Sequence, residues 1–252
     1  MNKVKTYYTN DYDEEIRLKR SQANSIEFTT TLKFLLKHLP KNCSVLDCCA
    51  GTGIYAFPLA ENGYKVTAGD LTEKHVEIIK SADKQNLLKE LYQGDCLDMS
   101  RFADESFDAV ICMGALYHLM DKKDREKCVK ECLRVLKKDG ILALAYLNRS
   151  GTYISSLYRE HPLDVLDDVI KTGMYGIFYS MDFNEINELT EKSSLEKITD
   201  VGVDGLVYPL FDKINNLTEA EFDLYMNYHF ATCEEPSIIG HSCHGLWIGK
   251  KI

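Results

Sequence analysis

Short apolar runs and amphipathic segments alternate along most of this chain. The apolar runs are too short for buried helices and rich in β-branched residues, which predicts strands that are buried on both faces. The predicted strands are 44–48, 65–69, 91–93, 107–113, 141–147, 195–203 and 244–249. Apolar residues recur at helical spacing over 24–39, 54–60, 72–82, 122–137, 183–191 and 218–229. This alternation predicts an α/β fold with a mostly parallel sheet and helices on both of its faces.

Residues 149–180 do not follow this alternation. They begin with a predicted loop at 150–152, continue as one or two helices broken at Pro162, and end in an aromatic, loop-like stretch. An insertion after the fifth strand lies over the carboxyl ends of the strands, where ligands bind in open α/β sheets. We therefore predict a helical substrate lid between a core at 24–148 and the remaining sheet and helices at 181–252.

Residues 45–55 predict a buried strand, a glycine-rich turn and the start of a helix. Gly51 and Gly53 permit backbone dihedrals that a Cβ forbids, or the close approach of a ligand. The turn has three interpretations: a plain strand-to-helix connection, a dinucleotide site, which the spacing to Ala56 also matches, or a site for S-adenosylmethionine (SAM). Asp47 favours SAM, because a carboxylate repels a pyrophosphate but attracts the ammonium and sulfonium of SAM.

This turn resembles motif I of the class I SAM-dependent methyltransferases. The resemblance extends over about residues 43–148, where successive motifs follow in the order and spacing of the methyltransferase type 11 group. It implies a Rossmann-like sheet of seven strands with an antiparallel last strand, SAM as the cofactor and S-adenosylhomocysteine as the product. It also implies that the tyrosine-rich segment 1–23 is a flap over the cofactor, and a solvated arm is the alternative.

The candidate cofactor residues follow the carboxyl ends of the predicted strands. Asp70 ends the second strand, where one carboxylate can accept hydrogen bonds from both ribose hydroxyls; capping the next helix is its alternative role. By resemblance, Asp95 accepts a hydrogen bond from the adenine amino group and the N–H of Cys96 meets a ring nitrogen, with Asp98 as the second candidate for adenine. The full set is Asp47, Ala50, Gly51, Gly53, Asp70, Leu71, Asp95, Cys96 and Met113.

The acceptor site is less constrained, because methyl transfer depends mainly on positioning and needs a base only when the acceptor must lose a proton. His118 lies in the loop after the fourth strand, which by resemblance faces the methyl group, and is the candidate base. Arg149 leaves the fifth strand at its carboxyl end and could bind an acceptor carboxylate. Structural packing or a surface ion pair is the alternative for these residues. Further candidates for the pocket are Tyr117, Tyr153, Tyr175, Tyr179, His241 and His244.

Composition narrows the function further. The chain has 252 residues, a formal net charge of −9 and nine cysteines. The negative charge disfavours nucleic-acid substrates, and the absence of a C-x-x-C pair, a signal peptide and a membrane span predicts a cytoplasmic protein with reduced thiols. His241 and His244 do not predict a metal site, because residues three apart on a strand point to opposite faces.

We therefore predict a methyltransferase that acts on an oxygen (carboxylate or hydroxyl) or nitrogen of a small molecule or peptide, without a metal. An NAD-linked oxidoreductase and a catalytically silent SAM-binding protein are the alternatives. The identity of the acceptor and the oligomeric state stay open.

Overall fold

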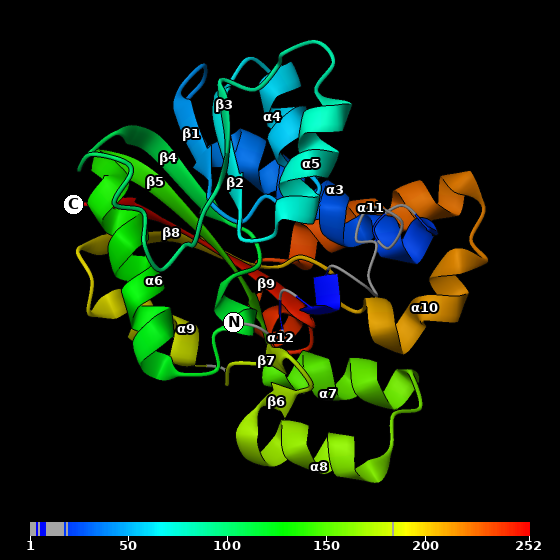
Figure 1. Ribbon diagram of the computed structural model, residues 1–252. Helices are drawn as coiled ribbons and strands as arrows, with labels where there is room; N and C mark the ends of the chain where they lie inside the picture. The colour runs from blue at the N-terminus through cyan, green and yellow to red at the C-terminus, as the bar shows by residue number, and fades with distance from the viewer. Residues whose placement is uncertain (1–3, 5, 9–17, 19, 183) are drawn as a thin grey trace.

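The computed structural model describes residues 4, 6–8, 18, 20–182 and 184–252. Its centre is a seven-stranded sheet with the order β3-β2-β1-β4-β5-β9-β8 (Figure 1). The pairs among β1 to β5 are parallel, whereas β9 runs antiparallel to β5 and β8. The strands are β1 Ser44–Asp47, β2 Lys65–Asp70, β3 Glu90–Gln93, β4 Phe107–Cys112, β5 Leu136–Leu147, β8 Leu195–Gly202 and β9 His244–Lys251. The predicted Rossmann-like sheet with an antiparallel last strand is confirmed.

The sheet separates two apolar cores, because alternate residues of a strand point to opposite faces. In β4, Ala109 and Ile111 belong to one core, and Val110 and Cys112 belong to the other. The first core includes residues of three helices, and the second includes residues of two helices that Figure 1 shows on the other side of the sheet. They are α3 Gln22–His38, α4 Ala56–Glu61 and α5 Glu73–Ala82, and then α6 Lys122–Val135 and α9 Glu185–Glu191.

Two helices that the sequence did not predict lie in the last third of the chain, α10 Val207–Asn215 and α12 Pro236–Ile239. Pro209 is compatible with α10 because it lies in the first turn, where a missing N–H costs no hydrogen bond. With α11 Glu219–Thr232, α10 packs on the start of α3 in a smaller core. In the described part of the chain, no helix has both the length and the apolar character that crossing a bilayer requires.

The start of α3 also differs from the prediction. The helix begins at Gln22 instead of residue 24, because the side chain of Ser21 caps it by accepting a hydrogen bond from the N–H of Asn24 (3.4 Å). Glu27, in the second turn of this helix, lines a cavity described below.

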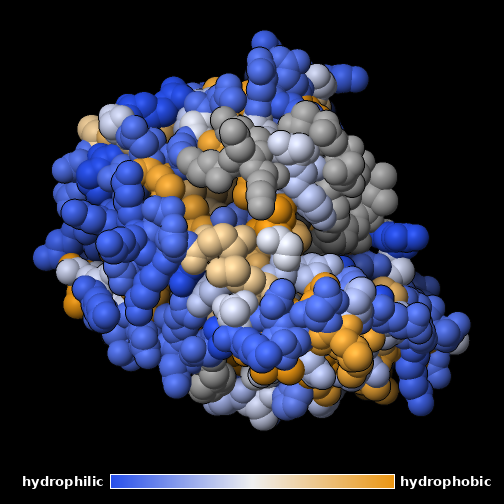
Figure 2. Space-filling model, turned by 60° about the horizontal axis from the view of Figure 1, so that its bottom comes forward, coloured by the Kyte–Doolittle hydropathy of each residue, from blue (hydrophilic) through white to orange (hydrophobic). Residues whose placement is uncertain are grey.

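The predicted lid consists of α7 Arg149–Tyr158, α8 Leu163–Thr172 and a hairpin of β6 Met174–Tyr175 and β7 Phe178–Tyr179. The predicted break at Pro162 is confirmed, because this residue is the N-cap of α8. The predicted loop at 150–152 is wrong, since Asn148 caps a helix that already begins at Arg149. Figure 2 shows apolar surface on the face that carries these helices, and Leu157, Leu163 and Ile170 are exposed.

His229 makes the contact between α11 and α3 sensitive to pH. Its buried ring places Nε2 2.9 Å from the hydroxyl of Thr30, and burial lowers its pKa from 6.5 to about 4. Between these pH values only the unfolded chain binds the proton. The stability that the neutral His229 contributes to the folded protein is therefore complete above pH 6.5 and is lost as the pH falls towards 4. We expect His229→Gln to reduce the acid-induced loss in free energy of unfolding by about 2–3 kcal/mol. Urea denaturation at pH 7 and 4.5 measures this, and an equal loss in both proteins would contradict it.

Candidate cofactor and acceptor site

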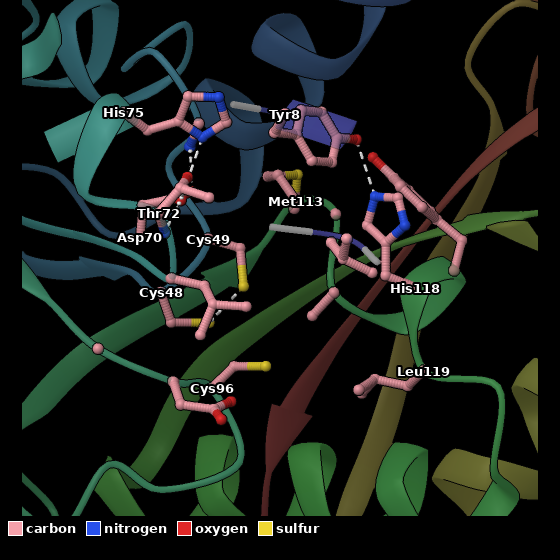
Figure 3. A pocket seen from close by; sticks show the side chains of 18 residues that line it. Tyr8, Cys48, Cys49, Asp70, Thr72, His75, Cys96, Met113, His118 and Leu119 are labelled. Atoms are coloured by element: carbon pink, nitrogen blue, oxygen red, sulfur yellow. Dashed lines mark hydrogen bonds and ion pairs between the residues drawn. The ribbon is translucent and has the colours of Figure 1, made fainter. Parts of the chain in front are cut away.

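A cavity, called the strand-end cavity here, opens where β1, β2, β3 and β4 end. It leaves about 740 Å³ free of protein atoms, part of it open to solvent. Figure 3 shows Asp70, Cys96 and His118 on different sides of this space. Of the residues predicted from the sequence, the structure places these at its wall: Gly51, Asp70, Leu71, Asp95, Cys96, Met113, Tyr117 and His118.

The two glycines of the turn after β1 have different roles. Gly51 lines the strand-end cavity at φ +55°, and a Cβ added there would meet no atom within 4 Å. Its backbone is therefore the surface that a ligand would touch. Gly53 has φ +87°, and a Cβ there would lie 2.7 Å from the ring of Phe57, away from the cavity wall. The structure thus gives Gly53 a role in packing, behind the turn.

Asp70 fixes the turn to the end of β2. Its Oδ2 accepts a hydrogen bond from the N–H of Gly51 (3.0 Å), while its Oδ1 accepts from the N–H of Thr72 (2.8 Å) and contacts Nδ1 of His75 (3.1 Å). Burial alone would raise the pKa of Asp70, but the hydrogen bond and charge of His75 and the hydrogen bonds of Thr72 outweigh it and lower the pKa. Asp70 is therefore an ionised acceptor at the cavity wall.

Asp47 lies behind this wall, directly before the lining residues Cys48 and Cys49. It is fully buried, and neither carboxylate oxygen has a hydrogen-bond partner among the described residues. Burial raises its pKa to about 8. Buried polar groups without partners are rare and costly, so this carboxyl favours a ligand that brings a cation or a donor.

The turn after β3 brings Asp95 and Cys96 to the cavity. Oδ1 of Asp95 accepts a hydrogen bond from the N–H of Leu97 (2.9 Å), which fixes the carboxylate at the wall. Asp98, the second candidate for adenine, is exposed, accepts from the N–H of Ser100 (3.1 Å) and lies outside the cavity.

His118 and Tyr8 form a hydrogen-bonded pair at the opposite wall. Nε2 of His118 lies 2.8 Å from the hydroxyl of Tyr8, and Nδ1 lies 3.1 Å from the carbonyl oxygen of Ile177. Because a carbonyl can only accept, Nδ1 carries the proton and Nε2 accepts from Tyr8. Burial lowers the pKa of His118 to about 4, against the opposing effects of the Ile177 carbonyl and Asp70. Near neutral pH the imidazole is thus uncharged, with its lone pair towards Tyr8.

A second cavity, the lid cavity, adjoins the first. It leaves about 600 Å³ free of protein atoms, and Tyr8 and Tyr117 line both cavities. Its polar groups include Arg159, which donates a hydrogen bond to the hydroxyl of Tyr208 (2.8 Å). Seven of its lining residues come from the predicted lid: Thr152, Ser155, Ser156, Arg159, His161, Tyr175 and Phe178.

A third cavity, the β9 cavity, lies next to the glycine turn and includes Ala50. His244 lines both this cavity and the lid cavity. Its Nδ1 donates to Oδ2 of Asp204 (2.7 Å) and lies 3.5 Å from Glu27. Two carboxylates therefore hold His244 between the lid cavity and the β9 cavity.

Four predicted substrate residues lie elsewhere. Arg149, Tyr153 and His241 line a separate cavity between α7 and α12, which shares no residue with the other three cavities. Tyr179 is buried and donates to Glu185 (2.7 Å). Because α7 begins at Arg149, the chain turns before this side chain can reach the strand-end cavity. The placement corrects the prediction that Arg149 binds a carboxylate beside the methyl group.

Residues 46–144 match a family model described as a methyltransferase domain. A glycine/sarcosine N-methyltransferase of Aphanothece halophytica is 34% identical over 152 residues, which are 56% of each chain. Residues 46–144 are therefore a domain of the class I SAM-dependent methyltransferases. The matched part spans about half the length of that relative. A ubiquinone biosynthesis O-methyltransferase of Idiomarina loihiensis is 29% identical over 74% of this chain and 73% of its own length.

Solved structures agree with this fold. A SAM-dependent methyltransferase described as a possible histamine N-methyltransferase, from Thermotoga maritima, covers all of both chains at 20% identity with a TM-score of 0.61. A SAM-dependent methyltransferase of Methanosarcina mazei has the same TM-score and identity and covers 87% of this chain and 97% of its own.

The strand-end cavity has a chemistry that fits SAM. Its wall carries the carboxylates of Asp70 and Asp95, with the partnerless Asp47 behind it, and none of the described lining residues is Lys or Arg. That charge suits an ammonium and a sulfonium and would repel a pyrophosphate. When bound, SAM supplies an electrophilic methyl group.

Tyr8, Arg159 and Glu27 line these cavities and Asp204 holds His244, although none of the four was predicted as a site residue from the sequence. Asp204 follows the strand predicted at 195–203, so the position that identified Asp70 would also have identified it. Tyr8 lies in the tyrosine-rich segment that was predicted only as a whole. Nothing in the local sequence could have placed Arg159 and Glu27 at a cavity, because the orientation of their helices depends on distant contacts.

Proposed function

We propose that this methyltransferase transfers the methyl group of SAM to a hydroxyl or amine of a small molecule or peptide, with His118 as the general base. The observation that carries the proposal is the junction of the strand-end and lid cavities at Tyr8 and Tyr117, with His118 directly beside it. A neutral imidazole there can take the acceptor's proton as the new bond forms. The acceptor reaches Nε2 by displacing the hydroxyl of Tyr8 or through it.

A carboxylate acceptor, which needs no base at neutral pH, is the second candidate. Arg159 in the lid cavity favours it, because a guanidinium there can bind a carboxylate through two donors. Comparing kcat and KM for Arg159→Lys with amine, hydroxyl and carboxylate acceptors separates the two. A rise in KM confined to carboxylate acceptors would favour the second candidate.

The other parts of the chain support this assignment. We propose that residues 149–180 are the substrate lid, because most of the lid cavity is lined by them. Val4 and Tyr8 line the strand-end cavity and support a cofactor flap, while residues 1–3, 5, 9–17 and 19 of the predicted flap lie outside the described residues. The nine free thiols and the net charge of −9 support a cytoplasmic enzyme whose substrate is not a nucleic acid.

Calorimetry with SAM and with NADH tests the cofactor. We expect heat of binding with SAM and none with NADH; the reverse would support an oxidoreductase. Incubation with SAM and a panel of amines and alcohols, followed by mass spectrometry, should then show S-adenosylhomocysteine and a product heavier by one methylene. SAM binding without product across cell-extract acceptors would support a silent SAM-binding protein.

The two candidate adenine partners give a matched pair of variants. We expect Asp95→Ala to weaken SAM binding about tenfold, because a hydrogen bond to a charged acceptor contributes about 1.5 kcal/mol. Asp98→Ala removes a carboxylate from the same turn but outside the cavity, so its dissociation constant for SAM should equal that of the wild type. Equal weakening by both substitutions would mean that the turn, and not the Asp95 side chain, holds the cofactor.

A further inference from the structure

Six of the nine cysteines of the chain meet in one place. Cys48, Cys112, Cys128 and Cys132 belong to a single core cluster, and Cys49 and Cys96 pack against it. They come from four different elements: the turns after β1 and β3, the end of β4, and one face of α6. None of them forms a disulfide. The proposed methyl transfer uses none of these thiols.

Topology and helix geometry explain the convergence. Parallel neighbours β1 and β4 end at the same edge of the sheet, so Cys48, directly after β1, and Cys112, the last residue of β4, meet there. Cys128 and Cys132 are four residues apart on α6, which places both thiols on the helix face that covers this edge.

The sulfur atoms lie close to the spacing that a tetrahedral metal ion requires. Sγ atoms of Cys48, Cys112 and Cys132 all lie within 4.8 Å of one another, and those of Cys112 and Cys128 are 3.8 Å apart. Four sulfurs at about 2.3 Å from a zinc ion are about 3.8 Å apart, by the geometry of a tetrahedron. The pair Cys112 and Cys128 already has this separation, and the three sulfurs of Cys48, Cys112 and Cys132 need to close by about 1 Å or less to reach it. A rotation of the Cys128 side chain would bring its sulfur towards the other two.

We propose that Cys48, Cys112, Cys128 and Cys132 form a tetrahedral site for Zn²⁺ or a divalent ion of the same preference for sulfur. Four cysteine sulfurs without histidine or water are the ligand set of a closed, structural zinc site. Cys48 also lines the strand-end cavity, so the ion has an entry path from solvent. This proposal departs from the prediction from the sequence that the protein holds no metal, which considered His241 and His244 as ligands and not these thiols.

Binding replaces thiol protons by the ion, which gives the site a second signature. The balance is Zn²⁺ plus four thiols giving a zinc tetrathiolate and four protons, with no change of oxidation state. Affinity must therefore rise with pH. The ion would hold the turn after β1 to α6, so the temperature of unfolding should rise with ion concentration, as expected for any ligand of the folded state.

The test uses the full chain, reduced, free of metal and kept under argon. Titration with Co²⁺ should produce the intense absorption of a tetrahedral cobalt thiolate with an endpoint at one ion per chain, and Zn²⁺ should abolish it. Cys112→Ser with Cys132→Ser should lose the absorption. Cys43→Ser with Cys233→Ser is the matched control, because both residues are buried but outside the cluster, and it should keep the absorption.

Circular dichroism of each variant shows whether it has folded. If the variant with Cys112→Ser and Cys132→Ser does not fold, the wild-type titration still tests the proposal. The intensity of the charge-transfer absorption reports how many thiolates bind the cobalt ion. An intensity typical of four thiolates supports the site. Absence of the band in the wild type, or a band that persists in the folded Cys112/Cys132 variant, would overturn the proposal and leave six thiols packed as small apolar side chains. Neither result bears on whether the protein transfers methyl groups.

Discussion

Replacing Asp47 with asparagine should stabilise the ligand-free protein and weaken its binding of SAM. Asp47 is fully buried without a described hydrogen-bond partner, and burial raises its pKa to about 8. At neutral pH the carboxyl must take up a proton on folding. This costs about 1.4 kcal/mol for each pH unit between the ordinary pKa of 3.8 and the working pH. An amide avoids this cost, so the free energy of unfolding at pH 7 should rise by roughly 2–4 kcal/mol.

The pH dependence has a definite sign. The folded protein keeps the Asp47 proton up to about pH 8, whereas the unfolded chain loses it near pH 3.8. Wild-type stability from this group therefore falls as the pH rises between these values. The gain in Asp47→Asn should be largest near pH 8 and disappear near pH 4, which urea denaturation at both values measures. SAM binding should weaken tenfold or more, because an amide cannot supply the negative charge that a bound cation would draw from the carboxyl of Asp47.

Asp108→Asn is the control, since it makes the same substitution at the other end of the sheet. Its carboxylate accepts hydrogen bonds from Ser44 and Lys137, and these outweigh partial burial to lower its pKa to about 2. This variant should lose stability at neutral pH and bind SAM like the wild type. Unchanged SAM affinity in Asp47→Asn would show that the cofactor does not use this carboxyl.

The sheet and the cofactor side could be predicted because they depend on local pattern and topology. Buried β-branched runs identified the strands, and residues directly after parallel strands must meet at one edge. Asp70 was found by this reasoning, whereas Asp95 came from the resemblance to the family's segment after the third strand. The lid was harder, since its local structure depends on distant contacts. Gly151 suggested a loop, yet it lies within α7. Glycine is needed there because the helix packs closely on the chain before β9, where a Cβ would be 2.1 Å from the backbone of Ser242.

Which arginine faces the lid cavity depends on the direction of α7. Arg149 begins α7 and Arg159 follows its end, so the two residues lie at opposite ends of the helix. Nothing in the local sequence indicates which end faces the lid cavity. The cap at Asn148 and the packing of α7 against the backbone before β9 decide it, and they place Arg159 at the cavity. The type of a residue at a strand end therefore predicts its place in a site less well than the path of the chain that follows it.

Replacing His118 with asparagine should remove most of the turnover while leaving SAM binding within about twofold. Asparagine can keep a hydrogen bond to the Ile177 carbonyl but has no basic lone pair for the acceptor's proton, and general bases contribute about 10²- to 10⁴-fold. We expect kcat to fall by about that factor for hydroxyl and amine acceptors. His241→Ala is the matched control, because His241 is exposed and lines a different cavity, and its kcat should not change.

The pH profile distinguishes a base from a merely structural histidine. Because burial holds the pKa of His118 at about 4, the imidazole stays neutral through the range in which an ordinary histidine would titrate. The wild-type kcat with an alcohol acceptor should therefore show no inflection near pH 6.5 and should fall only towards pH 4. Tyr8→Phe removes the hydroxyl that donates to Nε2 and should lower kcat less than His118→Asn does. Loss of SAM binding in His118→Asn, or turnover equal to the wild type, would exclude His118 as the base and make a carboxylate acceptor held by Arg159 the better explanation of the lid cavity.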